Sequence, residues 1–572
     1  MPALTDAKQE AVRLLKAALG KQYTPVVDDL ETPPDRALGD LAFPCFTLAK
    51  GLKRNPAELA VEIAAKVETG GLIRKAEAKG PYVNFSIQTS MFADSVLSEI
   101  ASRKGEYGTA EAANGKRVLV EYAQPNTHKE IHVGHLRNFF IGHAAVLLLK
   151  AAGYEVIPAT YINDLGMHVA KCLWDLKKFH TGEPVPAGNA ERVVLLGRVY
   201  AEATAAAEAD PAAKEDISKI FQDLEAGRGP YLVLWKKTRK WSLDEMKGVF
   251  KEVGLSFDVW YFESDLIPAA HALVADFKRK GIAVDSQGAV IVDLEAEGLG
   301  ANLLVRSDGT LLYNAKDLPL ALKKEEDFHP DRSVYVVDNR QSLALRQLFA
   351  TLRRAGFQKD LVHLAYDFVT LKEGAMSSRK GNIIRYQEFR DAILERARTE
   401  TRARHADWSP KKVERTARAV AFAALRFGML RQDPAKPILF DMDEALSFDG
   451  FTGPYLLYTL ARAKSILRKA RGRKVAIDGR KLVTPSEHRL VLTLAQYPSV
   501  VFETAQDFRF DRIAQCLFDL SKAFSEFYQE VPVLQSGADV ATVGARLVLV
   551  KAVVQVLENG LTLLGLPTVD EM

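Results

Sequence analysis

The chain has 572 residues, of which 48% are hydrophobic and 26% charged, and its 77 Lys and Arg against 73 Asp and Glu give a net charge of +4. A domain averages roughly 100 to 200 residues, so about three or four domains are expected. This composition excludes collagen-like, mucin-like and wholly disordered proteins, while so small a charge excess says little about nucleic acid until the basic residues are located.

Cysteine usage and hydropathy favour a cytoplasmic protein outside the membrane. The three cysteines lie far apart in the chain, at Cys45, Cys172 and Cys516. They predict neither a disulfide framework nor a structural zinc site. The charged amino terminus lacks the apolar core of a signal peptide. The most apolar late stretch, 547–566, is interrupted by Lys551 and Glu558, so no membrane span is expected.

The first part of the chain, residues 1–112, predicts an α+β unit. Helical periodicity covers 11–19 and 56–67, and 82–87 reads as a strand. A linker is expected around 111–116, where Asn114 precedes Gly115.

The next segment predicts a βαβ crossover. A β-rich run at 117–123 leads through a proline-bearing loop to a helix at 135–152, which Gly153 ends, and to a second strand at 154–161. Such a unit implies a parallel sheet, with a ligand crevice at the carboxyl ends of its strands.

The α/β pattern is interrupted and then resumes. Residues 181–308 contain Ala/Glu/Lys-rich helices and a β-like stretch at 289–294, and are expected to form an insertion. A strand at 333–338, a helix at 342–355 and a strand at 362–371 follow, after which the pattern is nearly all helical. We therefore expect an α/β domain at 113–385, a helical connection at 386–445 and an all-α domain at 446–572.

A run with two histidines stands between the first strand and helix of the crossover. Helix amino termini bind anions, because their first N–H groups lack partners and carry partial positive charge. His132 and His135 can both donate to one polyphosphate, and Gly134 leaves room for a nucleotide. Two alternatives are that the histidines merely cap the helix or that they bind zinc.

Residues 132–135 (HVGH) resemble the His-x-Gly-His motif of class I aminoacyl-tRNA synthetases, which nucleotidylyltransferases share. A second run, 373–382 (EGAMSSRKGN), is similar to the Lys-Met-Ser-Lys-Ser loop of the synthetases. The alternative for its basic residues is an ordinary surface turn. The two motifs together imply a Rossmann-type catalytic domain with helical insertions, and ATP with Mg²⁺ as a substrate.

The second run departs from the family pattern. Ala375 and Ser378 replace its lysines, so the cations that would stabilise a pyrophosphate leaving group are Arg379 and Lys380. In the arginyl branch a lysine before the His-x-Gly-His motif commonly compensates, and Lys129 stands there. The resemblance thus implies catalytic roles for His132, His135, Lys129, Arg379 and Lys380, and ATP binding by Gly134, His132, His135, Met376, Ser377 and Ser378.

Further runs resemble the arginyl-tRNA synthetase family: 121–126 (EYAQPN), 313–317 (YNAKD) and 338–341 (DNRQ). The resemblance implies that arginine is held by Glu121, Asn126, Tyr313, Asp317 and Gln341. A guanidinium is a planar fork of five donors, so carboxylates and an aromatic face suit it. Taken singly, Tyr313 could be a core aromatic, Asp317 a surface acid and Gln341 a strand cap. Buried acceptors left unpaired by lysine would give polar discrimination that needs no editing domain.

The basic residues concentrate in the last third of the chain. Residues 462–481 contain nine Lys or Arg against one acid, a density typical of phosphate-binding surfaces. The run 451–462 resembles the start of the helical anticodon-binding domain of the family, and the amino-terminal unit resembles its additional domain, implied to touch the tRNA elbow. The predicted tRNA-binding residues are Arg462, Arg468, Lys469, Arg471 and Arg473.

The implied function is the ATP-dependent activation of L-arginine to arginyl-adenylate and its transfer to the 2′-hydroxyl of the terminal adenosine of tRNA(Arg). A monomer is expected, and efficient activation is expected to need tRNA. The rival from another class is a non-catalytic RNA-binding paralogue, suggested by Ala375 and Ser378. Among sister synthetases, the cysteinyl branch would need zinc ligands, and the glutamyl branch would need cations facing the side chain of the substrate.

Overall fold

The computed structural model describes residues 3–33, 35, 38–109, 113, 115–372, 384–534 and 539–572.

The amino-terminal unit is α+β, as predicted. Its antiparallel sheet has the order β1-β3-β2. The elements are α1 (Ala3–Leu19), β1 (Leu41–Pro44), α2 (Phe46–Leu52), α3 (Pro56–Lys66), β2 (Ile73–Lys79), β3 (Tyr82–Ile87) and α4 (Thr89–Arg103). Helix α3 begins where the Asn55 side chain accepts from the N–H groups of Ala57 and Glu58.

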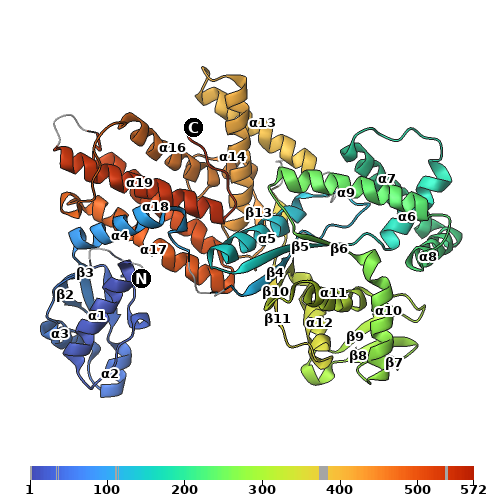
Figure 1. Cartoon of the computed structure of the whole chain (residues 1–572), viewed down its shortest axis with the longest axis horizontal. Helices are drawn as coiled ribbons and strands as arrows, with labels where there is room; N and C mark the ends of the chain where they lie inside the picture. Colours follow the sequence, from blue (N-terminus) through green and yellow to red (C-terminus); the bar gives the residue numbers. More distant parts are fainter. Residues whose placement is uncertain are drawn as a thin grey trace.

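A parallel five-stranded sheet forms the centre of the molecule (Figure 1). Its order is β11-β10-β4-β5-β6, with β4 (Arg117–Glu121), β5 (Glu155–Ile162), β6 (Val259–Phe262), β10 (Arg332–Asp338) and β11 (Asp360–Tyr366). The crossover helix α5 (Val133–Ala151) joins β4 to β5. Strand order reverses between β4 and β10, so a crevice is expected beyond Glu121 and Asp338, where these two strands end.

Two excursions leave this sheet. The first comprises helices α6 (Met167–Phe179), α7 (Asn189–Ala209), α8 (Pro211–Glu225) and α9 (Leu232–Glu252), before the chain returns as β6. The second comprises α10 (Glu263–Arg279), the antiparallel strands β7 (Val284–Ser286), β8 (Ala289–Asp293) and β9 (Ala301–Val305), and α11 (Tyr313–Phe328). Helix α12 (Ser342–Arg354) then connects β10 to β11. Because β6 pairs with β5, the segment 181–308 is two excursions rather than one uninterrupted insertion.

The stretch 362–371 holds two strands where the sequence predicted one. Strand β11 ends at Tyr366, and the separate strand β12 (Val369–Leu371) pairs in parallel with β13 (Ile438–Phe440). The break falls where the buried Arg137 takes the carbonyl oxygens of Asp367 and Phe368 as acceptors. The Phe368 carbonyl also accepts from the Ile438 N–H of β13, so this segment follows β13 instead of continuing the central sheet.

The carboxyl-terminal part is helical, as predicted. It contains α13 (Tyr386–Arg404), α14 (Pro410–Leu430), α15 (Met442–Leu446), α16 (Gly453–Lys469), α17 (Pro485–Asp507), α18 (Phe510–Glu530) and α19 (Val540–Leu563). Among the described residues, α19 alone is long and apolar enough to cross a membrane, with a mean hydropathy of 1.8. It packs against α16, α18 and α4, so it serves as a core helix of this bundle.

The amino-terminal unit docks on the helical bundle, although the two lie far apart in sequence (Figure 1). The Gly479 N–H donates to Asp94 at 2.7 Å, and the Tyr107 hydroxyl donates to the Leu494 carbonyl at 3.1 Å. His488 Nε2 lies 3.1 Å from an oxygen of Asp40. The amino-terminal unit and the helical bundle thus share one continuous hydrophobic core with the central sheet.

Candidate active site

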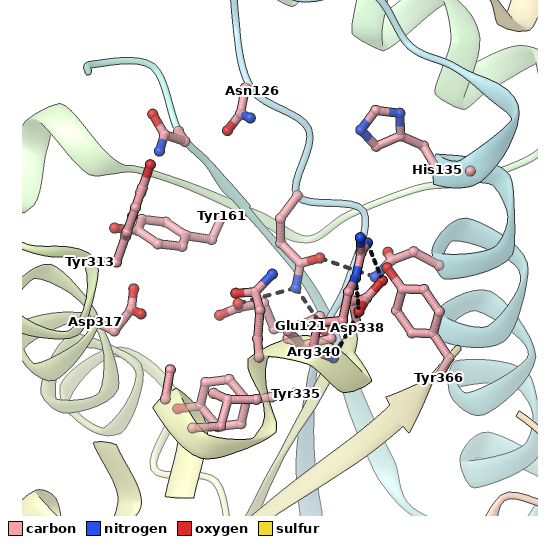
Figure 2. Close-up of a pocket in the computed structure, with 18 of the residues that line it drawn as sticks. Glu121, Asn126, His135, Tyr161, Tyr313, Asp317, Tyr335, Asp338, Arg340 and Tyr366 are labelled. Carbon is pink, nitrogen blue, oxygen red and sulfur yellow. Dashed lines mark hydrogen bonds and ion pairs between the residues drawn. The ribbon is translucent and has the colours of Figure 1, made fainter. Parts of the chain in front are cut away.

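A cleft of about 1250 Å³ lies at the carboxyl ends of β4 and β10, where the strand order reverses. Eight of the predicted site residues line it: Glu121, Asn126, His132, Gly134, His135, Tyr313, Asp317 and Gln341. They come from the ends of β4 and β10 and the loops that follow, the start of α5 and the start of α11. Figure 2 shows five of them around one space: Glu121, Asn126, His135, Tyr313 and Asp317. The predicted nucleotide and arginine residues therefore share one cleft.

The two histidines form a reciprocal cap at the start of α5. The Gly134 N–H donates to His132 Nδ1, and the His132 N–H donates to His135 Nδ1, both at 3.1 Å. The structure therefore confirms that the two histidines cap the helix. It does not exclude phosphate binding, because each Nδ1 acts as an acceptor and the proton of a neutral ring then sits on Nε2.

Burial keeps both rings neutral. It lowers the pKa of His132 to about 4 and that of His135 to about 3, and the nearby charge of Lys129 adds to both effects. At neutral pH each ring can therefore donate one Nε2–H hydrogen bond without carrying a charge. A Cβ at Gly134 would lie 3.0 Å from the His132 ring, so glycine at this position also leaves room for the capping histidine.

Lys129 does not line the cleft. Its Nζ lies over the Tyr200 ring, 5.3 Å from the centroid, and the residue borders a separate small cavity of about 10 Å³. Direct contact with a phosphate would need another rotamer. The other predicted catalytic and nucleotide residues, Met376, Ser377, Ser378, Arg379 and Lys380, lie outside the described residues.

The end of the cleft that contains the predicted arginine-binding residues Glu121 and Asp317, here called the arginine end, holds a buried ion pair. The sequence did not predict this pair. Glu121, at the end of β4, pairs with Lys324 of α11, and both side chains are almost completely buried. The Lys324 ammonium also lies 4.0 Å from the Tyr335 ring centroid. Burial opposes the charge of Lys324, but Glu121 and Tyr335 together more than offset this effect, so the lysine pKa is raised. Glu121 is therefore largely neutralised from within the protein.

Asp317 differs from the other carboxylates of the cleft. Glu263, the first residue of α10, accepts from Lys316 Nζ at 2.6 Å, whereas the Asp317 side chain has no hydrogen bond or ion pair with the described residues. Burial and, to a smaller extent, the charges of Glu121 and Glu263 together raise the pKa of Asp317 to about 8. A carboxylate held in this way calls for a cation from outside the protein.

The remaining predicted arginine residues line the rim. Tyr313 is 65% exposed at the start of α11, so the core-aromatic alternative is wrong. Asn126 forms a bridge with Asn163 beyond β5, and Gln341 ends a short 3₁₀ turn after β10. In that turn Arg340 pairs with Asp338 at 2.8 Å.

The polar lining or supporting residues that sequence reasoning missed include Tyr161, Glu263, Lys324 and Tyr335. Tyr161 and Tyr335 belong to strands whose apolar patterns indicate core. Lys324 lies on the same helix as Asp317, seven positions later, which places both on one face. This seven-residue spacing was the only feature of the sequence that could have indicated Lys324.

Several basic side chains of the predicted tRNA surface are engaged within the protein, so fewer are available to phosphates than the sequence indicates. Arg462 lies over the Tyr458 and Tyr528 rings, and Arg468 donates to the Asp570 carbonyl at 2.7 Å. Lys464, Arg480 and Lys481 are paired with acids. Three of the predicted residues remain exposed without an acidic partner in the described chain: Lys469, Arg471 and Arg473.

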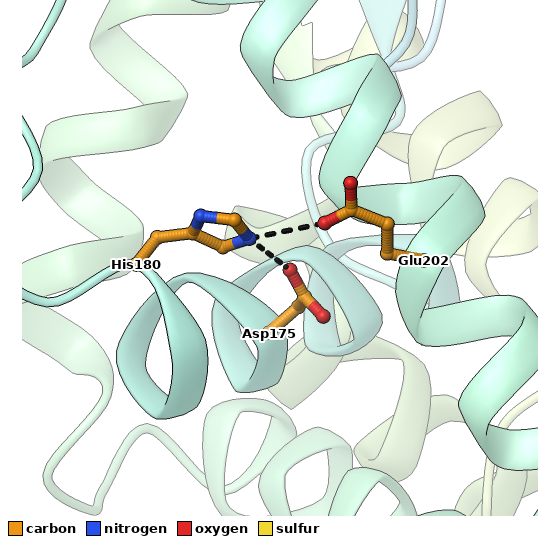
Figure 3. A group of neighbouring side chains, drawn as sticks. All are labelled: Asp175, His180 and Glu202. Carbon is orange, nitrogen blue, oxygen red and sulfur yellow. Dashed lines mark hydrogen bonds and ion pairs between the residues drawn. The ribbon is translucent and has the colours of Figure 1, made fainter.

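Within the described residues, one group brings three possible metal ligands together, and it lies away from the cleft (Figure 3). His180 Nε2 lies 3.0 Å from oxygens of both Asp175 and Glu202. Its Nδ1 lies 2.9 Å from Glu183, whose hydrogen bond raises the His180 pKa. A protonated His180 accounts for these contacts as an ion-pair link between α6 and α7.

Comparison with known proteins decides the family. The catalytic domain of class I tRNA synthetases (R) matches residues 96–442, the DALR anticodon binding domain matches 456–572, and the arginyl tRNA synthetase N terminal domain matches 7–87. The chain belongs to the arginyl-tRNA synthetase family. The arginine–tRNA ligase of Bdellovibrio bacteriovorus is 42% identical over 98% of both chains, and that of Treponema denticola is 34% identical over 95% of both.

A solved structure agrees. The arginyl-tRNA synthetase of Thermus thermophilus superimposes with a TM-score of 0.81 at 28% identity, covering 99% of this chain and 100% of its own. The predicted family, fold class and ligase activity are thereby confirmed. The synthetase thus combines a Rossmann-type catalytic domain, an α+β amino-terminal domain and a helical anticodon-binding domain.

Proposed function

We propose that this enzyme converts ATP and L-arginine to arginyl-adenylate and pyrophosphate in the described cleft, and then transfers the arginyl group to the 2′-hydroxyl of the terminal adenosine of tRNA(Arg). The observation that carries the proposal is the placement of two neutral imidazoles and an unpaired carboxylate at opposite parts of one cleft. ATP enters as its magnesium complex, with the metal bound through the phosphates.

At the nucleotide end, His132 and His135 act as hydrogen-bond donors. The cap holds their rings with centroids 3.8 Å apart, so both Nε2–H groups can reach oxygens of one phosphate chain. Donors fixed before the reaction stabilise developing charge without reorganisation. Arg379 and Lys380 are proposed to neutralise the leaving pyrophosphate, and Lys129 to contribute at longer range.

At the amino-acid end, Asp317 binds the guanidinium and Tyr313 covers it. Glu121 and Asn126 bind the end of arginine that carries the α-amino and α-carboxylate groups. We assign Glu121 to this end because Lys324 already neutralises it. We assign Asn126 to it because Asn126 lies on the loop that leads from β4 toward α5. Gln341 closes the rim beyond β10. The arginine carboxylate is then free to attack the α-phosphorus, and no covalent protein nucleophile is required.

The flanking domains are proposed to bind tRNA. Residues 446–572 would bind the anticodon arm through Lys469, Arg471 and Arg473, with Arg462 and Arg468 as weaker contributors because of their internal contacts. Residues 1–112 would contact the elbow, with 113–385 as the catalytic domain and 386–445 as its connection. We infer a cytoplasmic monomer.

The test is a single-turnover assay with ATP, L-arginine and total tRNA, using wild type and Asp317→Ala. Wild type should form arginyl-tRNA, whereas Asp317→Ala should lose arginine use and keep ATP binding by calorimetry. Wild type that binds tRNA but forms no product would favour the non-catalytic paralogue. Leu439→Ala, at an exposed position of β13, serves as a matched surface control.

A further inference from the structure

The cleft contains a buried hydroxyl that no described residue uses. Tyr161 lies on β5, and its hydroxyl oxygen is buried without a hydrogen-bond partner. Buried polar groups in proteins are nearly always paired, so an unpaired hydroxyl that lines a ligand cleft points to a partner supplied by the ligand.

Strand register explains why this hydroxyl belongs to the arginine end. Glu121 on β4 pairs with Ala159 on β5, and alternate side chains of a strand share one face, so Tyr161 projects on the same face as Glu121. Among nearby charges, Asp317 has the largest effect on the Tyr161 hydroxyl, followed by Glu263 and Glu121. Figure 2 draws Tyr161 beside Tyr313, above Asp317.

Four carboxylates act on the Tyr161 hydroxyl, and three of them have a cation partner within the protein. Glu121 pairs with Lys324, Glu263 with Lys316 and Asp164 with Arg239. Asp317 has no such partner among the described residues. Burial raises the Tyr161 pKa well above its usual value, so the hydroxyl keeps its proton and its lone pairs at neutral pH.

We propose that the Tyr161 hydroxyl is a specificity-determining group that accepts a guanidinium N–H of arginine beside Asp317. A guanidinium presents five donors in a plane, and one carboxylate accepts only two of them in a bidentate contact. A lysine ammonium is a point charge that Asp317 alone could neutralise. The hydroxyl therefore adds an acceptor that favours the binding of arginine over lysine.

This inference rests on the proposed function. One substitution tests the role of the Tyr161 hydroxyl separately from that function. Tyr161→Phe removes a single oxygen and keeps the ring. The matched control is Tyr122→Phe, because the Tyr122 hydroxyl is also buried and unpartnered but packs against Phe257 and does not line the cleft. Calorimetry measures the binding of L-arginine and of ATP to each variant, and thermal unfolding is followed without ligand.

The expected result for Tyr161→Phe is a roughly 10-fold weaker affinity for L-arginine, as for the loss of one hydrogen bond to a charged group. ATP affinity should not change. The melting temperature without ligand should stay equal or rise, because the variant removes an unsatisfied buried group. In aminoacylation assays the KM for arginine should rise more than kcat falls. Tyr122→Phe should bind arginine like wild type.

Two results would overturn the inference. Equal arginine affinity in Tyr161→Phe and wild type would show that the hydroxyl does not contact the substrate. A lower melting temperature with weaker binding of both ligands would assign Tyr161 a purely structural role. If wild type itself fails to bind L-arginine, the proposed function fails instead.

Discussion

Arg137 of α5 donates to the carbonyl oxygen of Asp367 at 2.8 Å and so ties the helix that carries both histidines to the chain entering β12. The same guanidinium donates to the carbonyls of Phe368, Asp433 and Pro434. A single buried side chain therefore joins α5 to the two chain segments that lead into β12 and β13.

Arg137→Met should loosen this junction. Four main-chain carbonyls would each lose a donor, and the Asp367 carbonyl would keep no other hydrogen bond among the described residues, which is costly for a partly buried group. Hydrogen exchange of peptides that cover β12 and β13 should become about 100-fold faster, which corresponds to about 3 kcal/mol of local stability. Arg396→Met, which removes an exposed pair with Asp443, is the control and should leave that exchange unchanged.

Substitutions at His132 should separate capping from catalysis. His132→Asn keeps a side-chain acceptor for the Gly134 N–H but loses the ring donor, whereas His132→Ala loses both. Both variants should lower the rate of adenylate formation by about 10²- to 10³-fold. Only His132→Ala should also lose about 1 kcal/mol of stability. Adenylate formation at wild-type rate in His132→Asn would contradict the phosphate-donor role.

Arginine binding should weaken as the pH falls. Burial raises the pKa of Asp317 to about 8, and the guanidinium needs the ionised carboxylate. Below pH 8 binding must therefore expel a proton, so affinity should fall by up to about tenfold per pH unit. Calorimetry between pH 6 and 9 would measure this, and a constant affinity between pH 6 and 8 would argue against it.

The same group makes the opposite contribution to stability without ligand. The folded chain keeps a proton on Asp317 up to about pH 8, whereas the unfolded chain loses it near its ordinary pKa of about 4. The folded state thus binds more protons in this window, and its stability falls as the pH rises from about 4 to 8. Asp317→Asn should therefore melt at a higher temperature than wild type at pH 8.

Glu121 and Lys324 should be strongly coupled. Lys324→Met leaves a buried carboxylate without its cation, which typically costs about 3 to 5 kcal/mol. Adding Glu121→Gln should restore much of that stability, because no charge then remains unpaired. Unfolding of the two single variants and the double variant completes the cycle. The exposed pair Lys323–Asp327 on the same helix is the control and should show little coupling.

Charge removal on the helical domain should lower the salt dependence of tRNA binding. Replacing Lys469, Arg471 and Arg473 by Gln should reduce the slope of log affinity against log salt by roughly 2 to 3, since each phosphate contact contributes roughly 0.7 to 0.9. Replacing Arg480 and Lys481, which are paired with Asp478 and Asp539, should change it less. An unchanged slope in the triple variant would remove this surface from the interface.

Local sequence patterns were enough for the elements that build the crossover. The predicted strand at 82–87 agrees with β3, and the predicted helix at 135–152 lies within two residues of α5, because apolar periodicity and capping act over a few residues. The short strand β6 was missed, because four residues after a helical excursion become a strand only by pairing with β5.

The sequence by itself determined the family, the order of the motifs and eight of the residues that line the cleft, because those depend on residue types at short spacing. Only the tertiary structure decided which charges remain available. It paired Glu121 with Lys324 and Glu263 with Lys316, left Asp317 without a partner in the described part of the chain, and placed the Tyr161 hydroxyl beside it. Such pairings join residues dozens to hundreds of positions apart, and desolvation, which sets their pKa values, exists only once the chain is packed.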